Sequence, residues 1–246
     1  MDQLSLFVDA YTQQGLRRSI NQDCIGIGSW RGGAGGDTEL SLNYLCDQKS
    51  ELFLLSDGIG GHDDGEIASR FAVDSIFELF QSQDNFDILS AISETHDKLT
   101  KIGFGSLRPL GATLVGLILT KNLVTIFSLG DSGCFYLNNN KLINVTEDTK
   151  SPKVPANVIE QCLGGGITKL KPSIVQRKFE IGDIFILMSD GVSNWLNEEK
   201  IKKIIQSNHL NSSRTLCAIA KKFGSNDDLS AIVIKTKSLD IPNFNF

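Results

Sequence analysis

The sequence Leu52-Phe53-Leu54-Leu55-Ser56-Asp57-Gly58 is a short apolar run that stops at a serine followed by Asp-Gly. The same order of residue types returns at Ile184-Phe185-Ile186-Leu187-Met188-Ser189-Asp190-Gly191. Apolar runs of this length are typical of buried strands. Glycine after aspartate allows the chain to turn tightly where the strand ends. Both stretches therefore predict a buried strand that ends at an acidic turn.

Working outward from these two strands, the remaining pattern predicts an α+β protein. Strands are clustered along the chain and do not alternate with helices, which favours helices covering antiparallel sheets over a doubly wound parallel sheet. The Gly-rich residues 31–37 are predicted as a loop, and residues 32–50 as an extended hairpin or surface loop. No linker rich in proline or serine divides the chain, so residues 1–246 are predicted to form one domain. The expected strands lie near 24–29, 40–45, 51–56, 112–119, 123–129, 133–137, 174–179, 183–189 and 229–234, and the expected helices near 64–81, 86–102, 197–206 and 212–223.

Composition excludes several classes of function. The 24 Lys and Arg residues are outnumbered by 29 Asp and Glu residues, a net charge of −5, which argues against a nucleic-acid-binding protein. No apolar run approaches the roughly 18 residues that a membrane span needs, and the first residues lack a basic secretory signal. The five cysteines include no close pair, which indicates reduced thiols. We therefore expect a cytoplasmic protein that binds neither nucleic acid nor membrane.

Aspartates fall repeatedly at the ends of predicted strands. Besides Asp57 and Asp190, Asp131 follows the strand 123–129, and Asp227-Asp228 directly precedes the strand 229–234. If these carboxylates converge, they repel one another, and a divalent cation removes the conflict. An all-oxygen ligand set suits Mg²⁺ or Mn²⁺ better than zinc. The alternative is that each Asp-Gly pair is an ordinary turn, and periodicity alone does not decide between the two.

With these motifs the sequence resembles the metal-dependent PP2C-type (PPM) serine/threonine protein phosphatases in their compact bacterial form. Each motif is short, but they occur in the family's order from about residue 15 to 235. The matching segments are Arg18-Ser19-Ile20-Asn21-Gln22-Asp23, Ser56-Asp57-Gly58-Ile59-Gly60-Gly61-His62 with Gly65-Glu66-Ile67-Ala68-Ser69, Gly111-Ala112-Thr113, Leu129-Gly130-Asp131-Ser132, Thr146-Glu147-Asp148, Ser189-Asp190-Gly191 and Asp227-Asp228-Leu229-Ser230.

The resemblance implies a β-sandwich of two antiparallel sheets flanked by helix pairs, and a centre with two Mn²⁺ or Mg²⁺ ions. In that centre Asp57 bridges the two ions and the Gly58 carbonyl helps to hold the second. Asp190 and Asp227 complete the ligand set of the first ion, and Asp23 acts through metal-bound water. Asp131 matches the position associated with a weak third metal.

Two further residues receive roles in the expected reaction. The resemblance implies that Arg18 binds the substrate phosphate, and its planar guanidinium is suited to this because it can donate two hydrogen bonds to phosphate oxygens. The alternative is a solvated surface arginine beside Arg17. His62 is a candidate general acid, although it also fits a histidine that bonds locally within its loop. In the eukaryotic form of the family a histidine follows Asp-Gly directly, whereas Ile59 stands there in this chain.

The chain departs from the family pattern in two places that affect the site. The flap beside the active site, at about residues 149–160, is predicted to be shortened or lost. Asn194 stands four residues after Asp190, where an acid is usual, and a neutral amide is a weaker metal ligand.

These features predict a monomeric protein phosphatase that hydrolyses phosphoserine and phosphothreonine with a water activated by two metal ions. It would reverse a cytoplasmic serine/threonine kinase, and its partners would be that kinase and its phosphorylated protein substrates. One alternative is a pseudophosphatase, a phosphoprotein-binding module with weak or no turnover. Another is a metal-dependent hydrolase of small phosphorylated metabolites.

Overall fold

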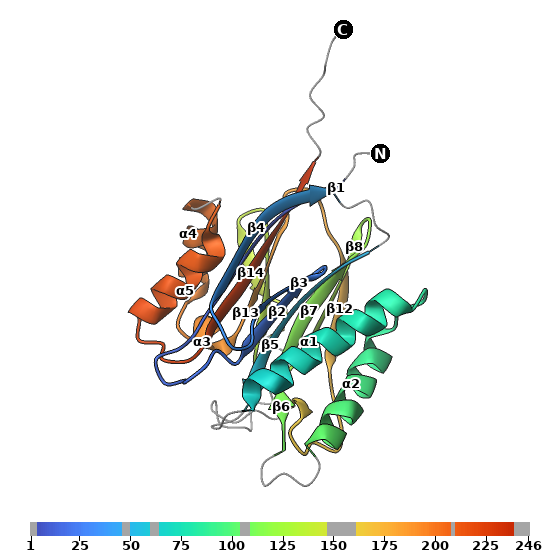
Figure 1. Ribbon diagram of the computed structural model, residues 1–246. Coiled ribbons are helices and arrows are strands. Elements are labelled where there is room, and N and C mark those ends of the chain that lie inside the picture. Colours follow the sequence, from blue (N-terminus) through green and yellow to red (C-terminus); the bar gives the residue numbers. More distant parts are fainter. Residues whose placement is uncertain are drawn as a thin grey trace.

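Two antiparallel sheets lie face to face in the computed structural model, and helices cover their outer faces (Figure 1). The structure describes residues 4–45, 50–59, 64–103, 109–146, 161–207 and 210–238. The α+β class predicted from the order of strands and helices is confirmed, and so is the sandwich of two antiparallel sheets that the resemblance implies.

The first sheet has six strands, and every neighbouring pair in it is antiparallel. Its two longest strands lie side by side over ten residue pairs, from Leu4 opposite Ser238 to Gln13 opposite Leu229. The order across the sheet is β10 (Lys141–Asn144), β9 (Gly133–Asn138), β13 (Ile184–Met188), β14 (Leu229–Ser238), β1 (Leu4–Gln13) and β4 (Thr38–Leu45).

The second sheet has eight strands, also paired antiparallel. Its main path is β11 (Leu163–Gly164), β6 (Gly111–Ala112), β5 (Glu51–Ile59), β7 (Leu114–Leu119), β8 (Leu123–Leu129) and β12 (Ser173–Lys178). Off this path, β2 (Asp23–Ile27) pairs with β5 and with β3 (Trp30–Gly33).

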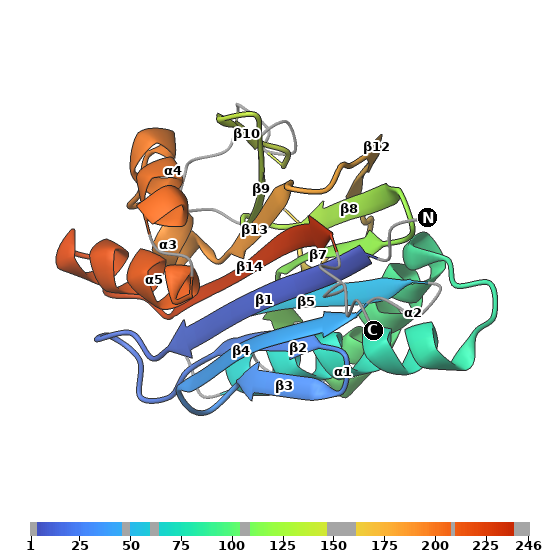
Figure 2. The ribbon, with the colours of Figure 1, turned by 90° about the horizontal axis from the view of Figure 1, so that it is seen from above.

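Helices α1 (Gly65–Ser82) and α2 (Ile88–Ile102) cover the eight-stranded sheet. The six-stranded sheet is covered by α5 (Ser212–Lys222), with α4 (Glu198–Ser207) and the short α3 (Asp190–Ser193) beside it (Figure 2). Helices α1 and α2 each bury a stripe of apolar side chains at three- and four-residue spacing, as expected for helices that cover a sheet. Asn197 Oδ1 accepts a hydrogen bond from the Lys200 backbone N–H at 3.0 Å, which caps the start of α4.

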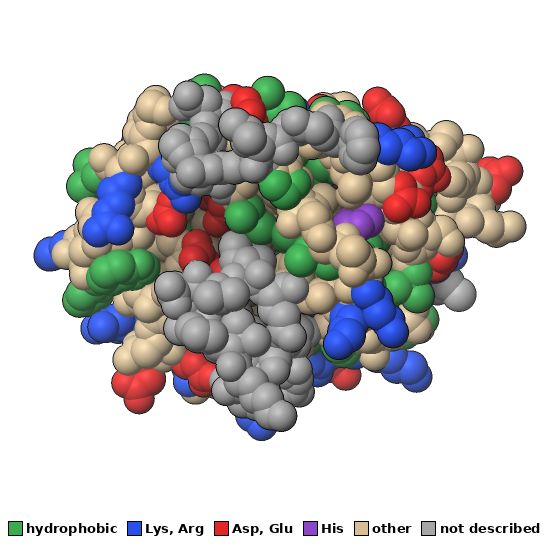
Figure 3. All heavy atoms as spheres, turned by 90° about the horizontal axis from the view of Figure 1, so that it is seen from below, with side chains coloured by type: hydrophobic (Ala, Val, Ile, Leu, Met, Phe, Trp, Pro, Cys, Tyr) green, Lys and Arg blue, Asp and Glu red, His purple; other side chains and the backbone are tan. Residues whose placement is uncertain are grey.

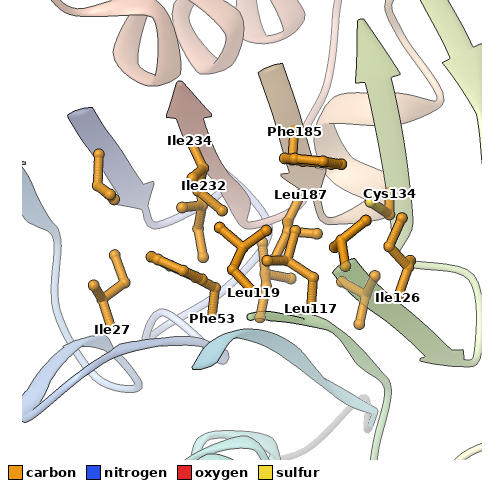
Figure 4. Packing of buried hydrophobic residues seen from close by; sticks show 14 of the residues in the cluster. Ile27, Phe53, Leu117, Leu119, Ile126, Cys134, Phe185, Leu187, Ile232 and Ile234 are labelled. Atoms are coloured by element: carbon orange, nitrogen blue, oxygen red, sulfur yellow. The ribbon is translucent and has the colours of Figure 1, made fainter. Parts of the chain in front are cut away.

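The core between the two sheets is made of apolar side chains from both inner faces (Figure 4). Ile27, Phe53 and Leu117 from one sheet face Phe185 and Ile232 from the other. All five are nearly or completely buried, and each such side chain contributes about 1.5–3 kcal/mol relative to an exposed one. This core fixes the strands whose ends carry the predicted site.

One strand was not expected, one expectation needs correction, and two predicted features lie outside the described residues. The sequence pattern does not predict β1, because the buried polar residues Asp9 and Thr12 interrupt its apolar pattern. The described residues of the stretch 32–50 do not form an extended hairpin or surface loop: β3 occupies the start of the predicted loop 31–37, and β4 pairs with β1. The predicted shortened flap, at about 149–160, lies outside the described residues, as does His62. Among the helices that the structure describes, none is long and apolar enough to cross a membrane.

Candidate active site

The predicted acidic residues meet at the lower end of the sandwich in Figure 1, where strands of both sheets begin or end. Asp23 begins β2 and lies directly opposite Asp57 near the end of β5. Asp131 follows β8 in the same sheet, while Asp190 and Asp227 flank β13 and β14 of the other sheet. Figure 3 shows this end from below, with Asp and Glu side chains gathered in a hollow of the surface.

The electrostatics of Asp57 show that these carboxylates are close to one another. Burial raises the pKa of Asp57 well above its usual value, and the charges of Asp23, Asp190, Asp227 and Asp131 raise it further. Four acids from four other segments therefore act on one carboxyl group. The structure therefore brings these carboxylates close enough for their charges to act on Asp57.

Asp23 is the most deeply buried member of this group, with 0% of its surface exposed. Burial raises its pKa, and the neighbouring charge of Asp228 adds to the rise. The hydroxyls of Ser189 and Ser230 act in the opposite direction, although neither lies at hydrogen-bonding geometry to the carboxyl group. Within the described part of the chain, neither Asp23 oxygen has a partner at hydrogen-bonding geometry. A buried carboxylate without donors is costly, so Asp23 is suited to face a cation or the water around one.

The backbone of Asp57 is held on both sides by Thr113. The Asp57 N–H donates to Thr113 Oγ1 at 3.0 Å, and the Thr113 N–H donates to the Asp57 carbonyl at 2.8 Å. Ser56 Oγ donates to the Thr113 carbonyl at 2.6 Å, and the Thr113 hydroxyl also bonds Ser132 Oγ at 2.9 Å. This network joins Asp57 to the residue that follows Asp131.

Gly58 and Gly191, which follow the two key aspartates, are required by close backbone contacts. A Cβ on Gly58 would lie 2.1 Å from the Gly65 carbonyl oxygen at the start of α1. A Cβ on Gly191 would lie 2.0 Å from the Asp228 carbonyl oxygen. Glycine at these positions lets the acidic turns pack directly against neighbouring backbone.

Arg18 reaches into the acidic group from the segment between β1 and β2. Its Nε donates to Asp227 Oδ1 at 3.0 Å, and both side chains are partly exposed. Burial acts to lower the pKa of Arg18, but the bond to Asp227 and the charges of Asp57 and Asp228 outweigh it, so the pKa is raised. Arg18 therefore stays charged beside the carboxylates, where an anionic group would meet it.

The residues fit a hard divalent cation in their chemistry: an all-oxygen set, mutual repulsion and a buried carboxylate without donors. Among the described residues, however, no three acidic, His or Cys side chains stand arranged around a single point as a metal cluster. Asp227 is turned toward Arg18, and Asp190 Oδ2 accepts from Asn194 Nδ2 at 3.3 Å. Coordination would require the side chain of Asp227 to turn away from Arg18.

Two contributors to this site have no assigned role in the sequence analysis. Thr113 enters it only as part of the Gly-Ala-Thr motif, and Asp228 only as part of the Asp-Asp pair. The sequence shows that Thr113 lies just before a predicted buried strand. It does not show the two hydrogen bonds between Thr113 and Asp57, because these residues lie in strands far apart in the chain. His96, which lies on the apolar face of α2, is buried and accepts from the Gly164 N–H at 3.0 Å, so it belongs to the core.

The fold and the acidic end together define a class: an α+β sandwich whose strand ends gather carboxylates suited to divalent cations. The chain belongs to the protein phosphatase 2C family, whose model matches residues 41–232. This confirms the family that the sequence motifs indicated.

Relatives and solved structures agree with this assignment. The serine/threonine protein phosphatase PstP of Mycobacterium tuberculosis is 22% identical over 94% of this chain, and the chain spans 45% of the length of that relative. The serine/threonine phosphatase stp of Listeria welshimeri is 26% identical, over 75% of this chain and 84% of the relative.

Among solved structures, the S. agalactiae serine/threonine phosphatase has a TM-score of 0.75 at 22% identity, covering 94% of this chain and 99% of that one. The catalytic domain of PstP in complex with two manganese ions has a TM-score of 0.72 at 22% identity, covering 96% of this chain and 100% of that one. At these identities the structural likeness bears on the fold alone.

Proposed function

We propose that this chain is a metal-dependent protein phosphatase that hydrolyses phosphoserine and phosphothreonine. The observation that carries the proposal is the meeting of Asp23, Asp57, Asp190 and Asp227 at one end of the sandwich, with both Asp23 oxygens buried and without donors among the described residues. Family membership and the manganese-containing structure of PstP support Mn²⁺ or Mg²⁺ as the cations.

Each predicted residue has a role in this proposal. Asp57 would contact both ions, with the Gly58 carbonyl on one of them and Asp190 and Asp227 on the other, while Asp23 would contact them through water. When bound, such an ion pair lowers the pKa of water and neutralises charge on a phosphoryl group. Asp131 would serve a weak third ion, for which Asn194 is a poorer ligand than an acid.

The chain's own groups would bind the substrate and hold it in place. Arg18 would leave Asp227 when the cations are present and donate to two phosphate oxygens, which orients phosphorus toward the attacking water. Thr113 would keep the Asp57 carboxylate in place through its two backbone bonds. His62 remains the proposed general acid for the leaving serine or threonine oxygen.

The proposal extends to partners and organisation. The substrates would be phosphorylated proteins made by a serine/threonine kinase of the same cell, and the enzyme would act as a cytoplasmic monomer. Reduced surroundings are supported by the four described cysteines, which are buried and free of disulfides. The whole chain would form one domain with a shortened flap. A phosphoprotein-binding module without turnover is not favoured, because all the acids that the reaction needs are present.

The test is phosphate release from phosphoserine and phosphothreonine peptides, with Mn²⁺ and with excess chelator. Asp57→Asn should lower kcat by several orders of magnitude, because it removes a charge that both cations would share. Asp183→Asn is the matched control: Asp183 is also buried but belongs to a separate cluster with Tyr136. Activity that persists in chelator would reject metal-assisted hydrolysis. Faster release from a phosphorylated nucleotide or sugar than from the peptides would favour the metabolite hydrolase.

A further inference from the structure

Asp228 is a buried carboxylate that binds two backbone groups, one at each end of the segment 15–22. It is 2% exposed. Its Oδ1 accepts from the Gly15 N–H and its Oδ2 accepts from the Gln22 N–H, both at 2.7 Å. Hydrogen bonds to a charged acceptor at this length are among the stronger ones in proteins. One side chain therefore holds both ends of a chain segment against the start of β14.

The segment that Asp228 holds is the one that carries Arg18. This segment also contacts the backbone that precedes β14: the Arg17 N–H donates to the Asn226 carbonyl at 3.1 Å. A Cβ on Gly15 would lie 2.2 Å from the Asp227 carbonyl carbon, so the two backbones touch. Gln14, which directly precedes the segment, donates from Nε2 to the Arg18 carbonyl at 2.7 Å.

The two hydrogen bonds that Asp228 accepts from Gly15 and Gln22 form a clamp on the segment 15–22. The Gln22 end of this clamp lies beside the acidic group. Gln22 directly precedes Asp23, and its carbonyl accepts from the Gly58 N–H at 3.1 Å. Asp228 thus fixes Arg18 relative to Asp23 and Asp57 while forming no part of the predicted ligand set. Both of its oxygens are used as acceptors, so an amide could satisfy only one of the two N–H groups.

We infer that Asp228 is a positioning residue for Arg18 and that, through the segment 15–22, it sets the affinity of the site for the phosphoryl group of the substrate. This inference rests on the proposed function. It assigns to the second aspartate of the pair Asp227-Asp228 a role distinct from that of the first, because Asp227 faces Arg18 and Asp228 faces the backbone.

The test compares Asp228→Asn with Asp9→Asn in the full chain. Asp9 is a matched control because it is also buried and also accepts two hydrogen bonds, in its case from Ser213 near the start of α5. For Asp228→Asn we expect the KM for a phosphoserine peptide, and the inhibition constant of inorganic phosphate, to rise about tenfold. We expect kcat and the Mn²⁺ affinity measured by calorimetry to change less than about twofold. Asp9→Asn should leave KM unchanged.

A second measurement needs no turnover. Hydrogen exchange of peptides that cover residues 15–22 should be faster in Asp228→Asn than in the wild type and unchanged in Asp9→Asn, because at least one of the Gly15 and Gln22 amides loses its acceptor. Unchanged exchange overturns the inference, and so does an unchanged KM in an active wild type. A fall in Mn²⁺ affinity as large as the rise in KM would also overturn it, since the effect would then run through Asp227. If the wild type releases no phosphate with Mn²⁺, the proposed function fails, and the exchange result decides the positioning role by itself.

Discussion

Asp23 and Asp57 are direct partners in the antiparallel pair of β2 and β5. Directly opposite residues in such a pair have Cα atoms about 4.5–5.5 Å apart, so folding itself brings the two carboxyl groups together. Burial and the proximity of the other acid raise the pKa of Asp57, and burial with the charge of Asp228 raises that of Asp23. Without a cation this end of the molecule is destabilised by its own charges.

Asp23→Asn should therefore stabilise the protein in the absence of metal. The variant removes a buried carboxyl group whose ionisation is opposed by burial and by the charge of Asp228, while keeping the size of the side chain. We expect the melting temperature in chelator to rise by at least about 2 °C, which for a chain of this size is near 1 kcal/mol. We expect Mn²⁺ to raise the melting temperature less than it does in the wild type. Thermal unfolding with and without Mn²⁺ measures both.

Asp183→Asn is the comparison for that experiment. Asp183 is 2% exposed, but its Oδ2 accepts from the Tyr136 hydroxyl at 2.7 Å and from the Glu180 N–H at 2.8 Å. An amide there loses acceptor capacity, so this variant should melt at a lower temperature whether or not Mn²⁺ is present. If both variants were destabilised equally in chelator, the burial of the Asp23 carboxyl group would not be unfavourable, and the prediction would be wrong.

Thr113 should matter through its hydroxyl. Thr113→Val keeps the shape of the side chain but leaves the Asp57 N–H without its acceptor, which costs about 1–3 kcal/mol. Mn²⁺ affinity should fall as well, because the carboxylate of Asp57 is less well fixed. Thr113→Ser keeps the hydroxyl and should restore most of both properties. Denaturant unfolding and calorimetric Mn²⁺ titration of the two variants provide the measurement, and equal Mn²⁺ affinities for the two would contradict the prediction.

Gly58→Ala should destabilise the protein strongly. The added methyl group would meet the Gly65 carbonyl at 2.1 Å, and overpacking against backbone costs about 1–3 kcal/mol or more. Gly36→Ala is the control, since a Cβ there would have nothing within 4 Å. Urea unfolding should show a lower midpoint for the first variant only. A Gly58→Ala protein as stable as the wild type would mean that the start of α1 can move away from the acidic turn.

The stability of the folded protein should depend on pH through Asp9. Burial raises the pKa of Asp9, against the bonds from Ser213 and the charge of Lys235, which lower it. A carboxyl group with a raised folded pKa contributes its full stability below its unfolded pKa of about 3.9, and that contribution is lost as the pH rises through the folded pKa.

The variant Asp9→Asn removes this titration. Its amide carries no charge at any pH in the range, and it can keep both bonds because the Ser213 hydroxyl can also accept. The stability of Asp9→Asn relative to the wild type should therefore increase from about pH 4 to pH 7, as measured by urea unfolding at each pH. A difference that stays flat over this range would show that the pKa of Asp9 is not raised.

The layers of the fold could be predicted from the sequence because they depend on local apolar periodicity. The run 52–56 and the face of α2 both indicate their buried side without reference to distant residues. β1 could not be recognised in this way, since its buried positions include Asp9 and Thr12, whose partners Ser213 and Ser230 lie more than 200 residues away. β3 could not be predicted from the sequence because two of its four residues are glycines.

The candidate site was predictable to the extent that aspartates at strand ends were visible as a repeated motif. Their convergence, the opposition of Asp23 and Asp57 and the clamp formed by Asp228 depend on strand register and on contacts across the sandwich. The pairing of Arg18 with Asp227 likewise joins residues 209 positions apart. No local pattern carries such information.

The pairing of Leu4 with Ser238 means that the described polypeptide nearly closes on itself. Because β1 and β14 run antiparallel along their full length, both ends of the described chain emerge at the edge of the sandwich opposite the aspartates (Figure 1). A short linker from residue 238 to residue 4 should therefore make a circular permutant, opened instead at the Asn139–Asn140 turn between β9 and β10. This circular permutant would keep every contact among the acidic residues. Either of its new ends, at residues 139 and 140, could be attached to a surface while the acidic end of the sandwich stays open to solution.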